Sequence, residues 1–140
     1  MEKLIKVLVE KNSDGYFFTT QNIEGVISST GNTFEEAKNN LEELLEIAKE
    51  LDEVYNQYTL NFEFKMSVAD FFESFPEVKK SELGNRLGID KSLMSQYTSK
   101  NEKVKQNYIS DERLLKIQEE IHRLGKELQS VQFYTKEIHQ

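Results

Sequence analysis

The chain has 140 residues, of which 37% are hydrophobic and 31% charged, and its formal net charge is −7. This length accommodates one ordinary domain or two small ones, and the absence of cysteine excludes a disulfide framework and thiolate chemistry. No apolar run approaches the length of a signal-peptide core or a membrane span, so we expect a cytoplasmic protein with no membrane partner.

The charge is distributed unevenly along the chain. Residues 1–65 contain 6 Lys/Arg and 13 Asp/Glu, whereas residues 66–140 contain 12 of each kind. Residues 79–105 alone contain seven basic and three acidic side chains. An acidic first half and a locally basic second half indicate two domains with different partners.

Three short segments of the first half have the alternating pattern of β-strands. Ile5, Val7 and Val9 share one face of the first segment, and Asp14-Gly15 favours a tight turn before the second. The third segment follows a short connection. We therefore expect strands at residues 4–9, 16–20 and 26–30.

The pattern then changes from strand-like to helical. Thr33 and Glu36 form a capping box ahead of apolar residues at helical spacing, which predicts a helix from Phe34 to about Asp52. Strict alternation returns at residues 59–66 and predicts a fourth strand. The first half is therefore expected to be a βββαβ domain, a small sheet with one helix on one face.

The second half is expected to be all-helical. Ser67 is placed to cap a helix that Pro76, the only proline, ends, and Ser110 is placed to cap a long final helix. The apolar stripe of that final helix consists of Leu114, Ile117, Ile121, Leu124 and Leu128. We therefore expect an α+β protein with two domains, at residues 1–66 and 67–140.

Residues 81–97, with the sequence SELGNRLGIDKSLMSQY, have the pattern of a helix-turn-helix. The pattern predicts one helix at 80–87 and a second at 91–97. Gly84 is expected where the two helices touch, because a residue without a side chain permits close approach. Gly88 is expected to end the first helix with a positive φ.

The turn between these helices has signals of its own. Ile89 is expected to fill the turn, and Asp90 is placed to cap the second helix. Met94 and Tyr97 should then face the core, which leaves hydroxyl, amide and ammonium groups facing outward. The residues that we expect to contact base edges or phosphates of DNA are Lys80, Lys91, Ser92, Ser95, Gln96 and Lys100. The alternative interpretation of this pattern is an ordinary αα-hairpin of a helical protein.

The two halves together resemble a known family. The first half is similar to the HicB-like antitoxin domain, which has a reduced ribonuclease-H-like βββαβ fold, in residues 4–9, 14–16, 25–26 and 31–37. The second half, from residues 67–72 onward, resembles the lambda-repressor-like (XRE-type) helix-turn-helix found behind that domain in one branch of the family. This chain departs from the family in its longer connection at 100–107 and in the lack of a proline at 22–25.

The resemblance implies an antitoxin of a HicAB-type toxin–antitoxin system. Such a protein binds and blocks a small RNA-cleaving toxin of the HicA type, and it represses its own operon by binding operator DNA. The acidic first domain would complement a basic toxin, although its acidic helix face also fits an ordinary solvated surface. A homo-oligomer, a dimer or higher, is expected because a palindromic operator is bound by at least two copies.

Two other functions remain compatible with the sequence. One is a stand-alone transcription regulator whose first domain senses a ligand or dimerises. The other is a protein-interaction module whose helical domain binds protein instead of DNA. Co-purification with a toxin and salt-sensitive DNA binding would distinguish the three functions.

We expect neither an enzyme nor a site for a cofactor or a metal. Two-metal catalysis needs several converging carboxylates. The presence of Asp14 is explained by the Asp-Gly turn, and Glu10 and Glu63 are expected to face solvent. His122 is expected on a helix surface, and the histidines and cysteines needed for a zinc cluster are lacking. The chain also contains no phosphate-binding glycine loop and no nucleophile elbow.

Overall fold

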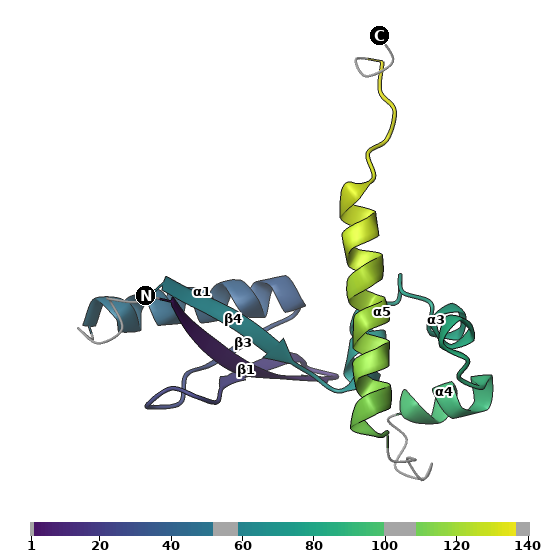
Figure 1. The fold of residues 1–140 in the computed structure, drawn as a ribbon. Helices are drawn as coiled ribbons and strands as arrows, with labels where there is room; N and C mark the ends of the chain where they lie inside the picture. The colour runs from purple at the N-terminus through teal and green to yellow at the C-terminus, as the bar shows by residue number, and fades with distance from the viewer. Residues whose placement is uncertain (1, 52–58, 100–108, 137–140) are drawn as a thin grey trace. The chain divides into compact units, whose positions relative to one another are not determined.

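The structure is a computed structural model that describes residues 2–51, 59–99 and 109–136, and its fold is of the mixed α+β class (Figure 1). The chain divides into two compact units, residues 1–76 and 77–140. The elements in chain order are β1 (Glu2–Asn12), β2 (Gly15–Thr20), β3 (Ser28–Gly31), α1 (Phe34–Leu51), β4 (Thr59–Lys65), α2 (Val68–Ser74), α3 (Lys80–Leu87), α4 (Lys91–Tyr97) and α5 (Asp111–Ser130).

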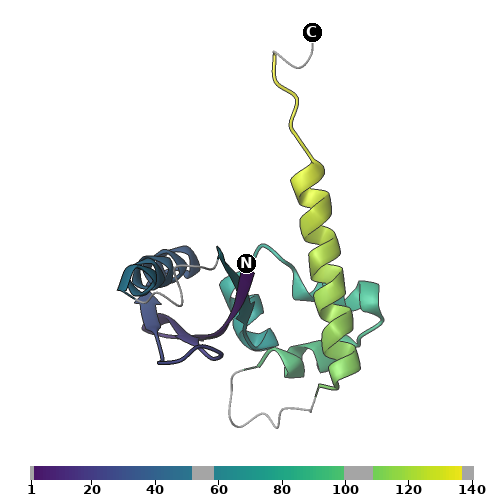
Figure 2. The same ribbon diagram turned by 60° about the vertical axis from the view of Figure 1, so that its left-hand side comes forward.

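The first unit is built on a four-stranded sheet with the order β3-β2-β1-β4. β1 pairs with β2 and β2 pairs with β3 in antiparallel register, whereas β1 pairs with β4 in parallel register. Parallel neighbours need a long crossover, and α1 supplies it while lying along one side of the sheet (Figure 2). The expected βββαβ order is therefore confirmed.

The core of this unit lies between the sheet and α1. Alternate residues of β1, among them Ile5 and Val7, share one face of the strand and are fully buried, as are Phe18, Ala37 and Leu41. Fully burying an aliphatic or aromatic side chain of this size contributes roughly 1.5–3 kcal/mol. Burial of one face of each element therefore holds α1 on the sheet.

The third strand differs from its predicted position at 26–30. Val26 is 73% exposed, and the strand begins at Ser28 and ends at Gly31. At its start, Ile27 N–H donates to Thr20 Oγ1 and Thr20 N–H donates to the Ile27 carbonyl, both at 3.0 Å. One of the two hydrogen bonds between Thr20 and Ile27 therefore uses a side chain. Regular pairing of β3 with β2 begins at the next residue, Ser28.

The helix α2 belongs to the first unit. The domain boundary that the sequence predicts between residues 66 and 67 therefore falls inside that unit. Asp70 Oδ2 accepts a hydrogen bond from the Lys11 backbone N–H at 3.2 Å, and Lys11 Nζ lies 2.9 Å from Glu73 Oε1. The Phe75 ring lies 6.0 Å from the Phe34 ring at the start of α1. These contacts join α2 to β1 and α1, and the division therefore follows Pro76.

The second unit consists of α3, α4 and α5. Its buried side chains come from all three helices and the turn between the first two: Leu83, Ile89, Met94, Tyr97 and Ile117. As expected, Ser110 caps α5, because its Oγ accepts from the Arg113 backbone N–H at 3.2 Å. The predicted apolar stripe of α5 is only partly covered, since Leu128 remains 63% exposed. Among the described helices, none is long and apolar enough to span a bilayer.

Candidate functional site

The helices α3 and α4 meet at Gly84, as the sequence predicts. A Cβ atom at this position would lie 3.3 Å from Met94 Cγ and 3.4 Å from the Ile89 carbonyl oxygen, which is tighter than most van der Waals contacts. The Ile89 backbone N–H donates to the Gly84 carbonyl at 2.8 Å. A larger residue would therefore make the Met94 side chain shift by a few tenths of an ångström, whereas glycine fits the observed distance between the two helices without a shift.

The turn between α3 and α4 differs from the prediction in one respect. Gly88 has a φ of 69° and ends α3 in the left-handed conformation, and Ile89 is buried, both as expected. Asp90 occupies the N-cap position of α4, but its side chain makes no capping hydrogen bond. Its carboxylate is exposed, so it contributes to α4 as a negative charge at the positive end of the helix dipole.

One face of α4 presents three of the predicted DNA-contacting residues to solvent. Lys91, Ser92 and Ser95 are exposed, and Ser95 lies four residues after Lys91 and three after Ser92, so the three are neighbours on the helix surface. Gln96, another predicted contact residue, is half-buried. The opposite face is buried, and it includes Met94.

Lys80, the fifth predicted contact residue, lies at the other end of α4. Its Nζ donates to Thr98 Oγ1 at 3.2 Å, and that hydroxyl in turn donates to the Met94 carbonyl at 3.1 Å. The ammonium group therefore lies beside the negative end of the α4 dipole. The structure thus places Lys80 apart from Lys91, which begins the helix, and Lys100 lies outside the described residues.

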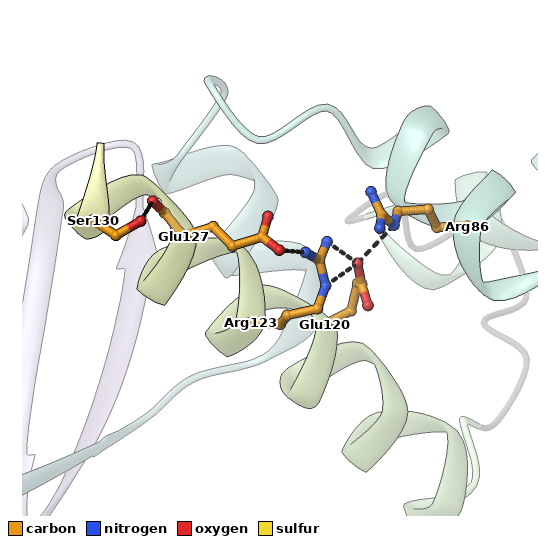
Figure 3. A network of polar contacts seen from close by, with 5 residues as sticks. All are labelled: Arg86, Glu120, Arg123, Glu127 and Ser130. Atoms are coloured by element: carbon orange, nitrogen blue, oxygen red, sulfur yellow. Dashed lines mark hydrogen bonds and ion pairs between the residues drawn. The ribbon is translucent and has the colours of Figure 1, made fainter. Parts of the chain in front are cut away.

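A chain of charged side chains connects α3 to α5 (Figure 3). Arg86 Nε lies 2.9 Å from Glu120 Oε1, and Arg123 pairs with both Glu120 and Glu127 along α5. The hydrogen bond from Arg123, together with the charges of Arg123 and Arg86, holds the pKa of Glu120 below its ordinary value. The hydrogen bonds that Arg123 donates to Glu120 and Glu127 raise the pKa of Arg123. The network therefore stays charged at neutral pH and joins the two helices.

A second polar contact connects α4 to α5. Arg113 Nη1 donates to the Tyr97 hydroxyl at 2.9 Å, and the Tyr97 ring is buried. Sequence analysis missed both connections. The spacing of Glu120, Arg123 and Glu127 by three and four residues predicts pairing along one helix, but the contacts to Arg86 and Tyr97 join residues far apart in the chain.

The first unit contains a groove of about 320 Å³ between α1 and β4. Its lining combines apolar side chains, the buried Leu45 and the half-buried Leu60 and Phe62, with two carboxylates of α1. The groove is lined by Glu42, Leu45, Glu46, Lys49, Thr59, Leu60 and Phe62. Such a surface can accept an apolar side chain while pairing with a nearby cation.

Two of the residues considered for catalysis have local contacts. Asp14 lies in the β1–β2 turn, where its backbone N–H donates to Asn12 Oδ1 at 2.8 Å, and the carboxylate of Glu63 lies 3.6 Å from Lys65 Nζ. Across the described ranges, the structure brings together no group of three His, Asp or Glu side chains that could hold a metal ion.

Comparisons of the chain with models of protein families, with curated proteins and with solved structures found no match. A functional assignment therefore depends on the two surfaces described above. These are the exposed face of α4, formed by Lys91, Ser92 and Ser95, and the groove between α1 and β4.

Proposed function

We propose that this protein is an antitoxin of the HicB type that also represses its own operon. Its second unit would bind operator DNA through a helix-turn-helix formed by α3 and α4, and its first unit, with a reduced ribonuclease-H-like fold, would bind a small RNA-cleaving toxin. The observation that carries the proposal is the close α3–α4 crossing at Gly84 combined with the exposed polar face of α4.

The α4 face has the chemistry of a DNA-reading helix. The hydroxyls of Ser92 and Ser95 can donate to or accept from base edges, and the ammonium group of Lys91 can pair with a phosphate. A major groove about 12 Å wide admits one helix with its side chains. The contact of Tyr97 with Arg113 ties α4 to α5, and the contact of Arg86 with Glu120 ties α3 to the same helix, which supports the fixed orientation that base reading requires.

The toxin-binding assignment is supported by charge and shape together with the resemblance to HicB-like domains. A protein that cleaves RNA is expected to be basic, because it must approach phosphates. Glu42 and Glu46 in the lining of the groove can pair with such a surface, and Leu60 and Phe62 can contact an apolar side chain. Complementary charge of this kind mainly speeds association and selects the partner.

DNA binding is tested by titrating the full chain with the DNA upstream of its own gene and with a random duplex. Replacing both Ser92 and Ser95 with alanine should weaken the specific complex about tenfold, which is ~1.4 kcal/mol, and leave random DNA unaffected. Lys91→Ala should weaken both complexes and reduce the slope of log affinity against log salt by about 0.9. Ser81→Ala, an exposed serine on α3, is the matched control and should change neither complex.

Toxin binding is tested by co-expressing the chain with the adjacent gene and measuring co-purification. Replacing Glu42 and Glu46 with lysine should abolish co-purification. Replacing Glu43 and Glu50, two exposed glutamates of α1 outside the groove lining, should preserve it. Equal loss in both double variants would assign the effect to the overall charge of α1 rather than to the groove.

A second candidate function is a stand-alone regulator whose first unit senses a small ligand. It is favoured by the volume of the groove, about 320 Å³, which lies at the lower end of the roughly 300–1,000 Å³ typical of ligand sites. A regulator of this kind would bind its operator but would not co-purify with the product of the adjacent gene.

A further inference from the structure

The groove of the first unit lies beside an edge strand of the sheet. With the strand order β3-β2-β1-β4, β4 pairs with β1 on one side, and no strand of the described residues pairs with its other side. β4 is seven residues long, so its outer side presents a row of backbone N–H and C=O groups without a strand partner. Such an edge is a template for an extended segment of another chain.

Side chains of β4 alternate between the two faces of the sheet. Phe62 and Phe64 are the register partners of the buried Ile5 and Val7, so they lie on the face that α1 covers. Glu63, between them in sequence, lies on the opposite face. A strand added beside β4 would alternate in the same way, so every second side chain of that strand would lie on the α1 face, at the groove.

The lining of the groove combines apolar surface with an excess of negative charge. Leu60 and Phe62 contribute apolar surface from β4. The helix α1 contributes two negative charges and one positive charge, those of Glu42, Glu46 and Lys49. The two carboxylates are four residues apart on one helix, where like charges repel, and among the described residues neither is paired with a cation. The groove therefore favours a side chain with an apolar stem and a positive end.

The aromatic side chains of β4 already have a cation beside them. Lys38 Nζ lies 5.9 Å from the centre of the Phe64 ring. The Phe62 ring is stacked on Phe64, with centroids 5.9 Å apart and 18° between the ring planes, and it lines the groove. A guanidinium group stacks on aromatic rings and binds carboxylates through two parallel hydrogen bonds, so arginine fits this lining better than lysine does.

We propose that β4 binds an extended, arginine-containing segment of a partner protein, which adds to the four-stranded sheet as a fifth strand. Arginines at alternate positions of the segment lie in the groove, with their stems on Leu60 and Phe62 and their guanidinium groups beside Glu42 and Glu46. Main-chain hydrogen bonds to β4 supply affinity, and the groove selects the side chains. The inference deepens the proposed function and rests on it only for the source of the segment, the RNA-cleaving toxin.

The site is tested with a synthetic peptide, so that no toxin is needed. The peptide is acetyl-Thr-Arg-Thr-Arg-Thr-Arg-Thr-amide, in which threonine favours an extended strand. Titration of the full chain with this peptide should show saturable binding. The same peptide methylated at every backbone nitrogen keeps its charge but cannot donate hydrogen bonds to β4, so it should not bind detectably. A peptide with glutamate in place of arginine should not bind either.

Two double variants separate the groove from the overall charge of α1. Glu42→Gln with Glu46→Gln should weaken binding of the arginine peptide about tenfold, because two ion pairs with the peptide are lost. Glu43→Gln with Glu50→Gln removes the same charge from exposed positions of α1 outside the groove lining and is the matched control. The control should change the affinity less than about twofold, because charges at that distance from the peptide are screened.

Hydrogen exchange locates the added strand. The bound peptide should slow exchange in β4 and leave exchange unchanged in β3, which is the other edge of the same sheet. Four results would overturn the proposal: no binding, equal binding of the methylated peptide, equal weakening in the two double variants, or slower exchange in β3 instead of β4. Exchange in β4 that slows with protein concentration alone would show that a second copy of the chain occupies this edge, and it would also overturn the proposal.

The proposed function and the β4 site can fail separately. Binding of the peptide at β4 without co-purification of the product of the adjacent gene would refute the proposed function and leave the site intact. Co-purification of that product without slower exchange in β4 would support the proposed function and overturn the site.

Discussion

The two units of the chain are stabilised in different ways. In the first unit, Ile5, Val7, Phe18 and Leu41 have no solvent exposure, and they fill the space between a sheet and a helix. Among the described residues of the second unit, fewer apolar side chains are buried than in the first, and polar contacts connect α5 to α3 and α4. The comparison indicates that the stability of the first unit depends on its apolar core. The arrangement of the helices in the second unit depends on a few individual contacts.

Truncation of the sheet core should have the largest effect. Phe18→Ala removes a fully buried ring that lies 5.1 Å from Phe34 and 5.5 Å from Phe64. We expect the first unit to lose about 3–5 kcal/mol of unfolding free energy. Hydrogen exchange should show lost protection in β1, β2 and β4 and unchanged protection in α3–α5. Equal loss in both units would contradict the independence of the two cores.

Separating α3 from α4 should have the next largest effect. Gly84→Leu places a side chain where even a Cβ is 3.3 Å from Met94, and overpacking of this kind costs about 1–3 kcal/mol. Thermal unfolding should report the loss in the second unit alone, and affinity for operator DNA should fall with it. Asn85→Leu adds the same side chain at the next, exposed position of α3 and should be close to neutral.

Removal of a single hydroxyl should have a smaller effect. Tyr97→Phe removes the acceptor for Arg113 Nη1 but keeps the buried ring, so we expect a loss of ~1 kcal/mol in the second unit. Urea unfolding of the natural chain and the variant measures the difference. A loss as large as that of Gly84→Leu would show that the hydroxyl has a further role in positioning α4.

Neutralisation of Glu120 should have the smallest effect and depend on pH. The pKa of this carboxyl is lowered in the folded chain, so its contribution is complete above the unfolded pKa and is lost as the pH falls through the folded pKa. Glu120→Gln should therefore lower Tm at pH 7, and the difference should shrink as the pH falls below 4.5 and through the lower folded-state pKa. A difference that stays constant as the pH is lowered would show that Glu120 acts through packing rather than charge.

Local features of this fold follow from the sequence, and long-range ones do not. Ser67, Ser110 and Gly88 act within one or two turns of their own helix, so residue type and spacing were sufficient to predict them. The place of α2 depends on contacts of Asp70 and Phe75 with residues far away in the chain, which spacing does not encode.

The same distinction applies to the candidate site. The exposure of Lys91, Ser92 and Ser95 follows from the period of one short helix, and the structure agrees with it. Lys80 is a predicted DNA contact because it is a cation beside the helix-turn-helix. Its hydrogen bond to Thr98 places its ammonium group at the C-terminal end of α4, opposite Lys91. Charge alone did not show which end of the helix the ammonium group would approach.

Under the proposed function, the length of α4 would link folding to DNA recognition. A helix of seven residues has almost no stability in isolation, because nucleation costs more than so few hydrogen bonds return. The exposed face of α4, formed by Lys91, Ser92 and Ser95, therefore exists only in molecules whose second unit is folded. Under the proposed function, apparent operator affinity is the intrinsic affinity scaled by that folded fraction. Any temperature or partner that shifts the folding equilibrium would then change the occupancy of the operator without touching a DNA-contacting residue.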